Sequence, residues 1–411
     1  MNRRDQKKLP NKSPQMPNAP RAGERGESIV WRFIAVYLLL VLIGFIVFRH
    51  PATMVRGNEL SVDRAMFTSI NAVTLTGFQQ TVAVDEYRWP GKIAALLLTI
   101  GGTLTTLVAG GMAVSRVARL GWSDRTIVIV ACVAELVVIS AGTFALLGRG
   151  RDGFEALFLA VSAFGNSGLQ LGALPQVDSG RTHLVLMPLA LAGGLGIPVL
   201  LMLGTMLRRR TPLPAYVRLA LALWAGSYVV GLVVLMLLSS GGRWRDTLST
   251  ASVQAINSRT TGLPFPMADG RPAHWALMVL MAVGGISGGA AGGIKLTTLW
   301  KLFTGTRAAL RGETPGPIFG IAITWVGLYF LLALVTLLCL LATEPGQPGD
   351  RLLFLVISAV SNVGLAQNPV SIVKGGMFVL SAAMLLGRIL PLAILWWVVA
   401  VVPEGDELPV G

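Results

Sequence analysis

Four short segments, each ending in a glycine followed by a large apolar residue, recur along this chain. The intervals between the glycines are 91, 94 and 102 residues, and each segment lies between strongly apolar stretches. Non-helical backbone at membrane depth persists only where it is buried in protein or lines water. Four such segments therefore predict four copies of one structural unit around a shared interior. The glycines are Gly77, Gly168, Gly262 and Gly364.

The composition indicates a membrane protein. Hydrophobic residues make up 53% of the chain and charged residues 13%, whereas soluble domains carry about 25% charged residues. Eight apolar stretches approach the roughly 20 residues that a membrane-spanning helix needs, so we expect an all-α membrane protein. The stretches lie near 29–48, 91–115, 126–148, 182–207, 215–239, 273–300, 317–342 and 374–402.

Each unit is expected to hold two spans with a pore segment between them. These tandem membrane–pore–membrane repeats would surround a central pore with pseudo-fourfold symmetry. A polar, basic segment before them, 1–28, is expected to be disordered, and a short tail, 404–411, follows them. The four repeats cover 29–120, 121–210, 211–312 and 313–403.

The distribution of positive charge predicts the orientation. Lys and Arg concentrate in the N-terminal tail and in alternate loops, which marks these segments as cytoplasmic. All four glycine segments then enter from outside in one orientation, which excludes inverted repeats. We expect a multi-pass protein of a bacterial-type cell (inner) membrane with both ends cytoplasmic, and the net charge of +14 does not indicate nucleic acid binding. The basic loops are Arg116–Arg125, Arg208–Arg218 and Lys295–Arg311.

A short segment of about ten residues, too short to span a membrane, precedes each glycine segment. An Asp opens each one, and Asp is a strong helix N-cap. We expect four half-helices whose partially negative C-terminal ends point at the membrane centre and favour a cation there. The four acidic residues are Asp63, Asp152, Asp246 and Asp350.

A glycine-rich stretch, 284–295, lies within the sixth apolar stretch. Close helix packing through small residues is one interpretation. A phosphate-binding loop is disfavoured because Ile294 separates Gly293 from Lys295, where that motif needs Gly-Lys. A break is favoured because each glycine costs a helix roughly 1 kcal/mol, and the resulting loop would form a gate. The gate residues are Gly284, Gly285, Ser287, Gly288, Gly289, Gly292, Gly293 and Lys295.

At these residues the chain resembles the membrane subunits of the Trk/Ktr potassium transporter superfamily, over roughly 29–402. Two departures stand out: the loop reads Ser-Gly-Gly-Ala-Ala-Gly where the family has Ser-Gly-Ser-Thr-Ala-Gly, and Leu390 stands where glycine is usual. The matching motifs are Thr74-Leu75-Thr76-Gly77-Phe78, Ser162–Leu169, Ser258–Leu263, Ser358–Leu365, Gly292-Gly293-Ile294-Lys295 and Gly387–Leu392.

The resemblance implies a K⁺-selective pore for uptake across the cell membrane, with no cofactor in this chain and Na⁺ as a second possible ion. It also implies that Arg388 lies beside the pore near the glycine loop and acts with it as a gate. Implied partners are membrane lipids, a second copy in a homodimer, and a cytosolic ring of nucleotide-binding regulatory proteins. The implied K⁺ ligands are carbonyls of Thr74, Leu75, Thr76, Gly77, Gly165, Asn166, Ser167, Gly168, Arg259, Thr260, Thr261, Gly262, Ser361, Asn362, Val363 and Gly364.

Two other functions stay open. A Na⁺- or H⁺-coupled symporter would use the same scaffold, with Glu135 as a candidate proton carrier. An intramembrane serine hydrolase would use Ser167, but no histidine is expected at bilayer depth, so we expect no enzyme activity. Arg259 is expected to turn away from the ion path and hold the filter backbone, and Lys295 to be a cytoplasmic anchor after the break.

Overall fold

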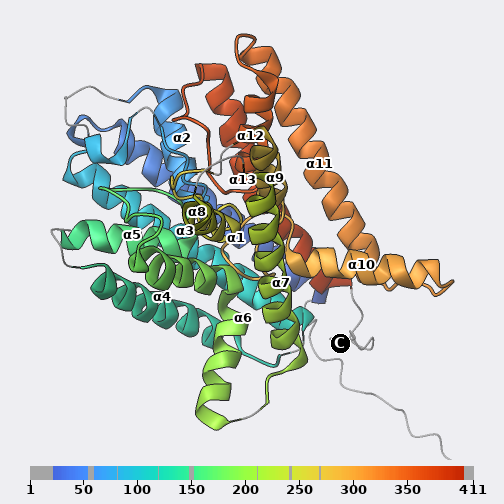
Figure 1. Ribbon diagram of the computed structural model, residues 1–411. Helices are drawn as coiled ribbons and strands as arrows, with labels where there is room; N and C mark the ends of the chain where they lie inside the picture. Colours follow the sequence, from blue (N-terminus) through green and yellow to red (C-terminus); the bar gives the residue numbers. More distant parts are fainter. Residues whose placement is uncertain are drawn as a thin grey trace, which may run out of the picture.

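The computed structural model describes residues 22–401 apart from 54–59, 81, 119, 148–151, 211, 240–242 and 268–269. The regular structure within these residues is helical, with isolated bridges in place of a sheet. Within the described residues, the order of long helix, short helix, loop and long helix occurs three times, and a fourth time with its last long helix divided (Figure 1).

The first two repeats follow this order without interruption. The first contains α1 (Ala22–Arg49), α2 (Val62–Val73) and α3 (Trp89–Val117). The second contains α4 (Asp124–Leu146), α5 (Gly153–Gly165) and α6 (Met187–Arg209), which follows a π-helical turn at Thr182–Leu186.

The third repeat departs from the pattern because its last long helix is broken. It contains α7 (Ala215–Leu238), α8 (Trp244–Asn257), α9 (Arg271–Ala282) and α10 (Leu296–Leu310). The fourth repeat is regular again, with α11 (Pro317–Thr343), α12 (Gly349–Val360) and α13 (Lys374–Val401).

Seven of the described helices are long and apolar enough to cross a membrane. They match seven of the eight expected spans. The sixth apolar stretch, 273–300, is divided into α9 and α10. The break falls within 284–295, where the glycines favoured it because glycine is unfavourable in a helix interior.

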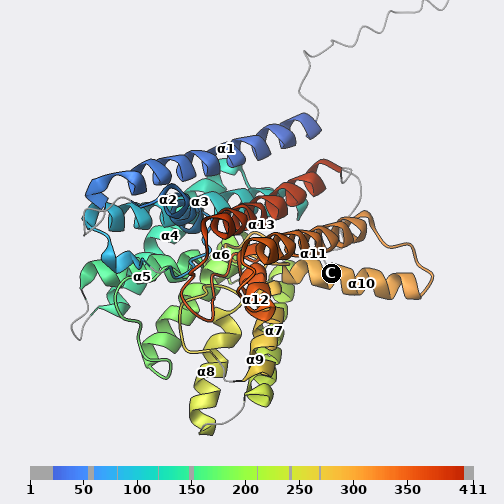
Figure 2. The same cartoon turned by 90° about the horizontal axis from the view of Figure 1, so that it is seen from above.

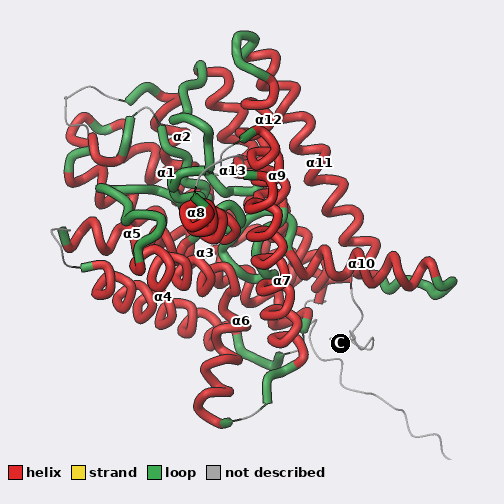
Figure 3. The backbone as a smooth tube through the Cα atoms, in the orientation of Figure 1, coloured by secondary structure: helices red, strands yellow, loops and turns green. Residues whose placement is uncertain are grey.

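The repeats pack in a closed circle. Helices of each repeat contact those of the next, and α13 of the last repeat contacts α1, α2 and α3 of the first. The two orthogonal views show the long helices around the short ones (Figures 1 and 2). The tube drawing shows the loops between them gathered near the middle of the molecule (Figure 3).

The first helix of each repeat lies outside, and the last helix lies further inside in the first, second and fourth repeats. In the most apolar windows of α1, α4, α7 and α11, 17–28% of residues are buried, against 33–67% in α3, α6 and α13. Exposed Leu, Ile, Val and Phe side chains cover the outer helices. Such a surface is stable against lipid tails, which are as apolar as these side chains.

The prediction that an Asp is the N-cap residue of each short helix is wrong for three of the four helices. Only Asp152 is the N-cap residue, with its carboxylate accepting a hydrogen bond from Phe154 N at 3.3 Å. Asp63, Asp246 and Asp350 lie within the first helical turn, because α2, α8 and α12 begin one or two residues earlier. A carboxylate there still interacts favourably with the positive end of the helix dipole.

The prediction that 1–28 is disordered is wrong for 22–28. Residues 22–28 form the first turns of α1, because the helix of the apolar stretch continues into residues such as Ala22, Glu24 and Arg25 that suit a helix. Residues 1–21 and the tail 404–411 lie outside the described residues.

Candidate functional site

The four glycine segments meet in a closed ring. Each glycine abuts the carbonyl group of the residue that precedes the glycine of the next repeat, and the fourth abuts the first. A Cβ would overlap the carbonyl oxygen of Ser167 if built on Gly77, of Thr261 if built on Gly168, of Val363 if built on Gly262, and of Thr76 if built on Gly364. No side chain fits between neighbouring segments.

The backbone conformation at these positions also requires glycine. The φ angles are 77° at Gly77, 71° at Gly168, 57° at Gly262 and 83° at Gly364. Residues with a Cβ rarely adopt such left-handed angles. Conformation and space therefore exclude a side chain at all four glycines for independent reasons.

A second left-handed residue stands two positions before the glycine in three repeats. These residues are Leu75, Asn166 and Asn362, with φ of 59°, 56° and 49°. The residue after each donates its N–H to the carbonyl five positions earlier, as Thr76 does to Asn71 at 3.1 Å. Two left-handed residues within three positions therefore end the short helix and turn the chain in each of these repeats.

The third repeat has a different turn. Thr260, at the corresponding position, is not left-handed. Gly262 itself donates its N–H to the carbonyl five positions earlier, on Asn257, at 2.9 Å. We expected four equivalent segments, but the segment at 259–262 is shifted by one residue against the others. No feature of the glycine spacing indicates this shift.

Asparagine side chains of the preceding short helices bond to the backbone of two of the glycine segments. Asn71 accepts a hydrogen bond from Phe78 N at 2.9 Å and donates one to Phe78 O at 3.0 Å. Asn257 makes the same pair of bonds to Leu263, at 2.9 and 2.8 Å. The sequence analysis missed both residues, although an Asn near the end of a short helix is an available signal.

The glycine-rich stretch forms a loop whose two ends are joined by backbone hydrogen bonds; these ends are called its base. Gly284 N donates to Ile294 O at 2.9 Å, and Ile294 N donates to Ala282 O at 2.8 Å. These bonds connect the end of α9 to the start of α10 although the helix itself is interrupted. The break interpretation, rather than continuous helix packing, matches this geometry.

The loop packs closely against its surroundings. Ala290 N donates to Gly193 O at 2.9 Å, where α6 bends, and a Cβ on Gly292 would overlap the carbonyl oxygen of Ser361. A Cβ on Gly110 of α3 would lie 2.8 Å from Cα of Gly288. The loop thus contacts the fourth glycine segment on one side and the helices α3 and α6 on others.

Arg259 reaches from the third glycine segment to the base of this loop. Its Nε donates to Val283 O at 3.2 Å and its Nη2 to Gly284 O at 3.4 Å. Its Nη1 donates to Ser227 Oγ at 2.6 Å, and the guanidinium lies 5.1 Å from the ring centre of Trp224. We expected this side chain to hold the filter backbone, but its hydrogen bonds go to the base of the loop and to Ser227 on α7.

Arg388 links the middle of the loop to the first glycine segment. The side chain is 3% exposed. Its Nη1 donates to Ala290 O at 2.6 Å, and its Nε donates to Thr74 O at 2.8 Å. Carbonyl oxygens from two different parts of the chain therefore stabilise one buried positive charge.

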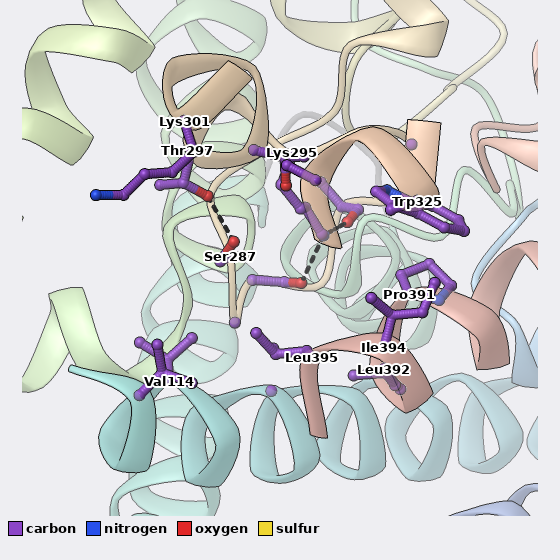
Figure 4. A pocket seen from close by; sticks show the side chains of 18 of the residues that line it. Val114, Ser287, Lys295, Thr297, Lys301, Trp325, Pro391, Leu392, Ile394 and Leu395 are labelled. Atoms are coloured by element: carbon purple, nitrogen blue, oxygen red, sulfur yellow. Dashed lines mark hydrogen bonds between the residues drawn. The ribbon is translucent and has the colours of Figure 1, made fainter. Parts of the chain in front are cut away.

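Lys295 is not the cytoplasmic anchor that we expected. Its ammonium group donates to Gly289 O at 3.3 Å and also to Ala291 O, which folds the side chain back across the loop. In Figure 4, dashed lines join it to loop carbonyls. The backbone of residue 295 lies at the base of the loop, and its long side chain reaches back to carbonyls near the tip.

A cavity of about 200 Å³ lies against the loop. The glycine loop, α3, α7, α10, α11 and α13 line it, and its lining includes Lys295, Arg388 and Trp325 (Figure 4). Ser287 Oγ lies 2.5 Å from Thr297 Oγ1 in its wall. Three basic residues, Lys295, Lys301 and Arg388, line the cavity, and most of its other lining side chains are apolar.

The residues of the two alternative functions are not part of this site. Glu135 is buried on α4, which does not line the cavity. Ser167 Oγ has no hydrogen-bond partner among the described residues, so no base contacts it there. The arrangement at 165–168 is that of a backbone turn.

Comparisons with known proteins agree with this architecture, although no protein-family model matches the chain. The "Ktr system potassium uptake protein B" of Vibrio alginolyticus is 26% identical, with 87% of this chain and 88% of that protein covered. The "Potassium/sodium uptake protein NtpJ" of Enterococcus hirae is 24% identical over 86% of this chain and 89% of that protein. This chain is a distant homologue of the Ktr/Trk potassium uptake transporters.

The fold gives the same result. The crystal structure of the potassium transporter TrkH from Vibrio parahaemolyticus matches with a TM-score of 0.71 at 20% identity, covering 91% of this chain and 84% of that chain. The expected resemblance is thereby confirmed, and the chain is an all-helical, multi-pass membrane protein of this fold. Its homologues are transport proteins, not enzymes.

We expect Arg259→Lys to lower the melting temperature of the detergent-solubilised Ktr/Trk homologue. A lysine cannot bond to Ser227 and both loop carbonyls at once and does not stack on Trp224 as a guanidinium does. Leaving buried acceptors unsatisfied costs about 1–3 kcal/mol. The control is Arg245→Lys on the exposed first turn of α8. Equal melting temperatures of the two variants, measured by size-exclusion chromatography after heating, would contradict the role of Arg259.

Proposed function

We propose that this chain takes up K⁺ across the cell membrane through the ring of glycine segments, and that the glycine loop gates the path. The observation that carries the proposal is the closed ring, in which each left-handed glycine abuts a carbonyl of the next repeat. The names of the relatives, which refer to potassium or potassium/sodium uptake, support the choice of ion.

In the proposed mechanism, backbone carbonyls replace the water shell of the ion. The ligands come from 74–77, 165–168, 259–262 and 361–364. The C-terminal ends of α2, α5, α8 and α12 add partial negative charge directly beside these segments. Because the third segment has a different turn, its carbonyls contribute a different geometry from the other three.

The gate consists of the loop 284–295 with Arg388. Their contacts support this role, because the loop bonds to Arg388 and lies against the fourth glycine segment. A positive charge beside the ion path repels a cation. Movement of the loop would remove Ala290 as a hydrogen-bond partner of this charge, so loop position and charge position are coupled.

The proposal also includes the repeat architecture, the orientation in the membrane and the assembly of this protein. The four repeats would be the membrane–pore–membrane units of an inner-membrane protein, with the glycine segments entering from outside and both ends cytoplasmic. Assembly would involve lipids, a second copy and a cytosolic nucleotide-binding ring. The V. alginolyticus relative is named as part of a Ktr system, which supports partner subunits.

A Na⁺- or H⁺-coupled K⁺ symporter is the second candidate. It is favoured by the potassium/sodium name of the E. hirae relative and by the buried carboxylate of Glu135. Both candidates use the same ring and differ only in whether a second ion provides driving force.

The purified protein in proteoliposomes is expected to take up K⁺ down the K⁺ gradient alone. The Na⁺ and H⁺ gradients are imposed and varied separately, and uptake is followed with ⁸⁶Rb⁺ or a K⁺ dye. A rate that follows either gradient would establish coupled transport in place of a channel. No uptake above that of empty vesicles under any gradient would refute both candidates.

Substitution of a filter glycine is expected to reduce ion discrimination. In Gly77→Ser the added Cβ overlaps the carbonyl oxygen of Ser167, so the two segments must move apart, and we expect a K⁺/Na⁺ uptake ratio about tenfold lower, which is about 1.4 kcal/mol of discrimination. Gly121→Ser is the matched control, because Gly121 has a similar φ of 69° but open space around it. An unchanged ratio in Gly77→Ser would remove the first segment from the filter.

Weakening the gate is expected to raise the rate of K⁺ uptake. Arg388→Ala removes the positive charge and its bond to the loop, and deletion of 286–291 removes the tip of the loop. Both variants should conduct several-fold faster than the wild type in the proteoliposome assay. Arg307→Ala, on exposed α10, is the control. If neither variant alters uptake while both fold, the loop is not a gate.

A further inference from the structure

The side chain of Gln79 bridges two neighbouring repeats at the glycine ring. Its Nε2 donates one hydrogen bond to Gly77 O at 3.1 Å and another to Gly168 O at 2.9 Å. One amide group thus holds the carbonyls of two successive ring glycines. No feature of the sequence analysis singled out this glutamine.

The backbone of the same residue connects to a third repeat. Gln79 O accepts a hydrogen bond from Val370 N at 2.8 Å, in the loop after the fourth glycine segment. Gln80 pairs with Val370 as an isolated bridge, and its own amide donates to Thr68 Oγ1 at 3.1 Å. Residue 79 therefore joins the first, second and fourth repeats at one point.

The other repeats have no matching side-chain bridge. The second also carries a glutamine two residues after its glycine, but Gln170 donates to Gly172 O within its own loop, at 2.6 Å. The third and fourth have Pro264 and Ala366 there, which carry no side-chain donor. The segment around each glycine is described in all four repeats, so the difference belongs to the repeats themselves.

The two hydrogen bonds restrain the distance between carbonyl oxygens. The NH₂ group donates one hydrogen to each oxygen, which fixes both oxygens relative to one nitrogen and opposes their closing around a smaller cation. Carbonyl spacing and field strength are what a filter of this kind has for distinguishing K⁺ from Na⁺. Loss of the bridge frees one carbonyl from each of two repeats.

We propose that Gln79 is a positioning residue that sets ion discrimination at the glycine end of the filter, through the Gly77 and Gly168 carbonyls. This inference rests on the proposed function, because it assigns a role within the same ring. It adds a side-chain determinant of specificity to a filter otherwise formed by backbone.

The test compares Gln79→Ala and Gln79→Met with Gln170→Ala in proteoliposomes, with K⁺ and Na⁺ uptake measured over a range of concentrations. Methionine keeps the length of the side chain and removes its donors. We expect both Gln79 variants to lower the K⁺/Na⁺ ratio of Vmax/KM, by a factor of about five for each hydrogen bond lost. Gln170→Ala should keep the wild-type ratio.

The outcomes separate this inference from the proposed function. A wild-type protein that transports K⁺ selectively, with Gln79→Met indistinguishable from it, would overturn the role of Gln79 and leave the function intact. A loss of Vmax for both ions at an unchanged ratio would also overturn it, since that pattern marks a structural role. A wild type without uptake above empty vesicles would refute the function itself.

Discussion

Backbone groups at the centre of a membrane must find their partners within the protein, because the lipid offers none. Within the described residues, the chain leaves the helical conformation inside the bundle at four glycine segments and at one glycine loop. Each interruption is surrounded by protein: the segments abut one another in a ring, and the loop contacts α3, α6 and α13. The ring is what the rest of the structure depends on, because it requires four short helices, four inner helices and a closed circle of repeats to hold it.

The symmetry of the ring is broken by cations. Arg259 extends from the third segment to the base of the loop, and Arg388 joins the middle of the loop to the first segment. Lys295 folds over the loop from its other end. Because buried charges need close partners, these three side chains bind carbonyls of the loop and couple its position to two segments of the ring. In the proposed function, the four glycine segments supply the ion path, and the glycine loop with these three cations controls it.

Much of the fold was predictable from local patterns. Apolar runs near the length of a membrane span gave the long helices, and the glycines of 284–295 indicated the break. The errors have physical causes. Asp63, Asp246 and Asp350 are not caps because the start of a helix depends on its neighbours as well as on its best capping residue. Lys295 was misassigned because its side chain reaches back to carbonyls that only the folded loop brings near it.

The sequence by itself determined the number of repeats, the positions of the four glycines and the place of the broken helix, since each depends on composition or spacing along the chain. Tertiary structure decided which groups face one another. It brought Gln79 to the carbonyl of Gly168, Arg388 to Thr74 and Ala290, and it shifted the turn at Thr260 by one residue. These contacts join residues up to 314 positions apart. Hydrogen bonds of this kind depend on the mutual placement of whole repeats, which a periodic pattern does not encode.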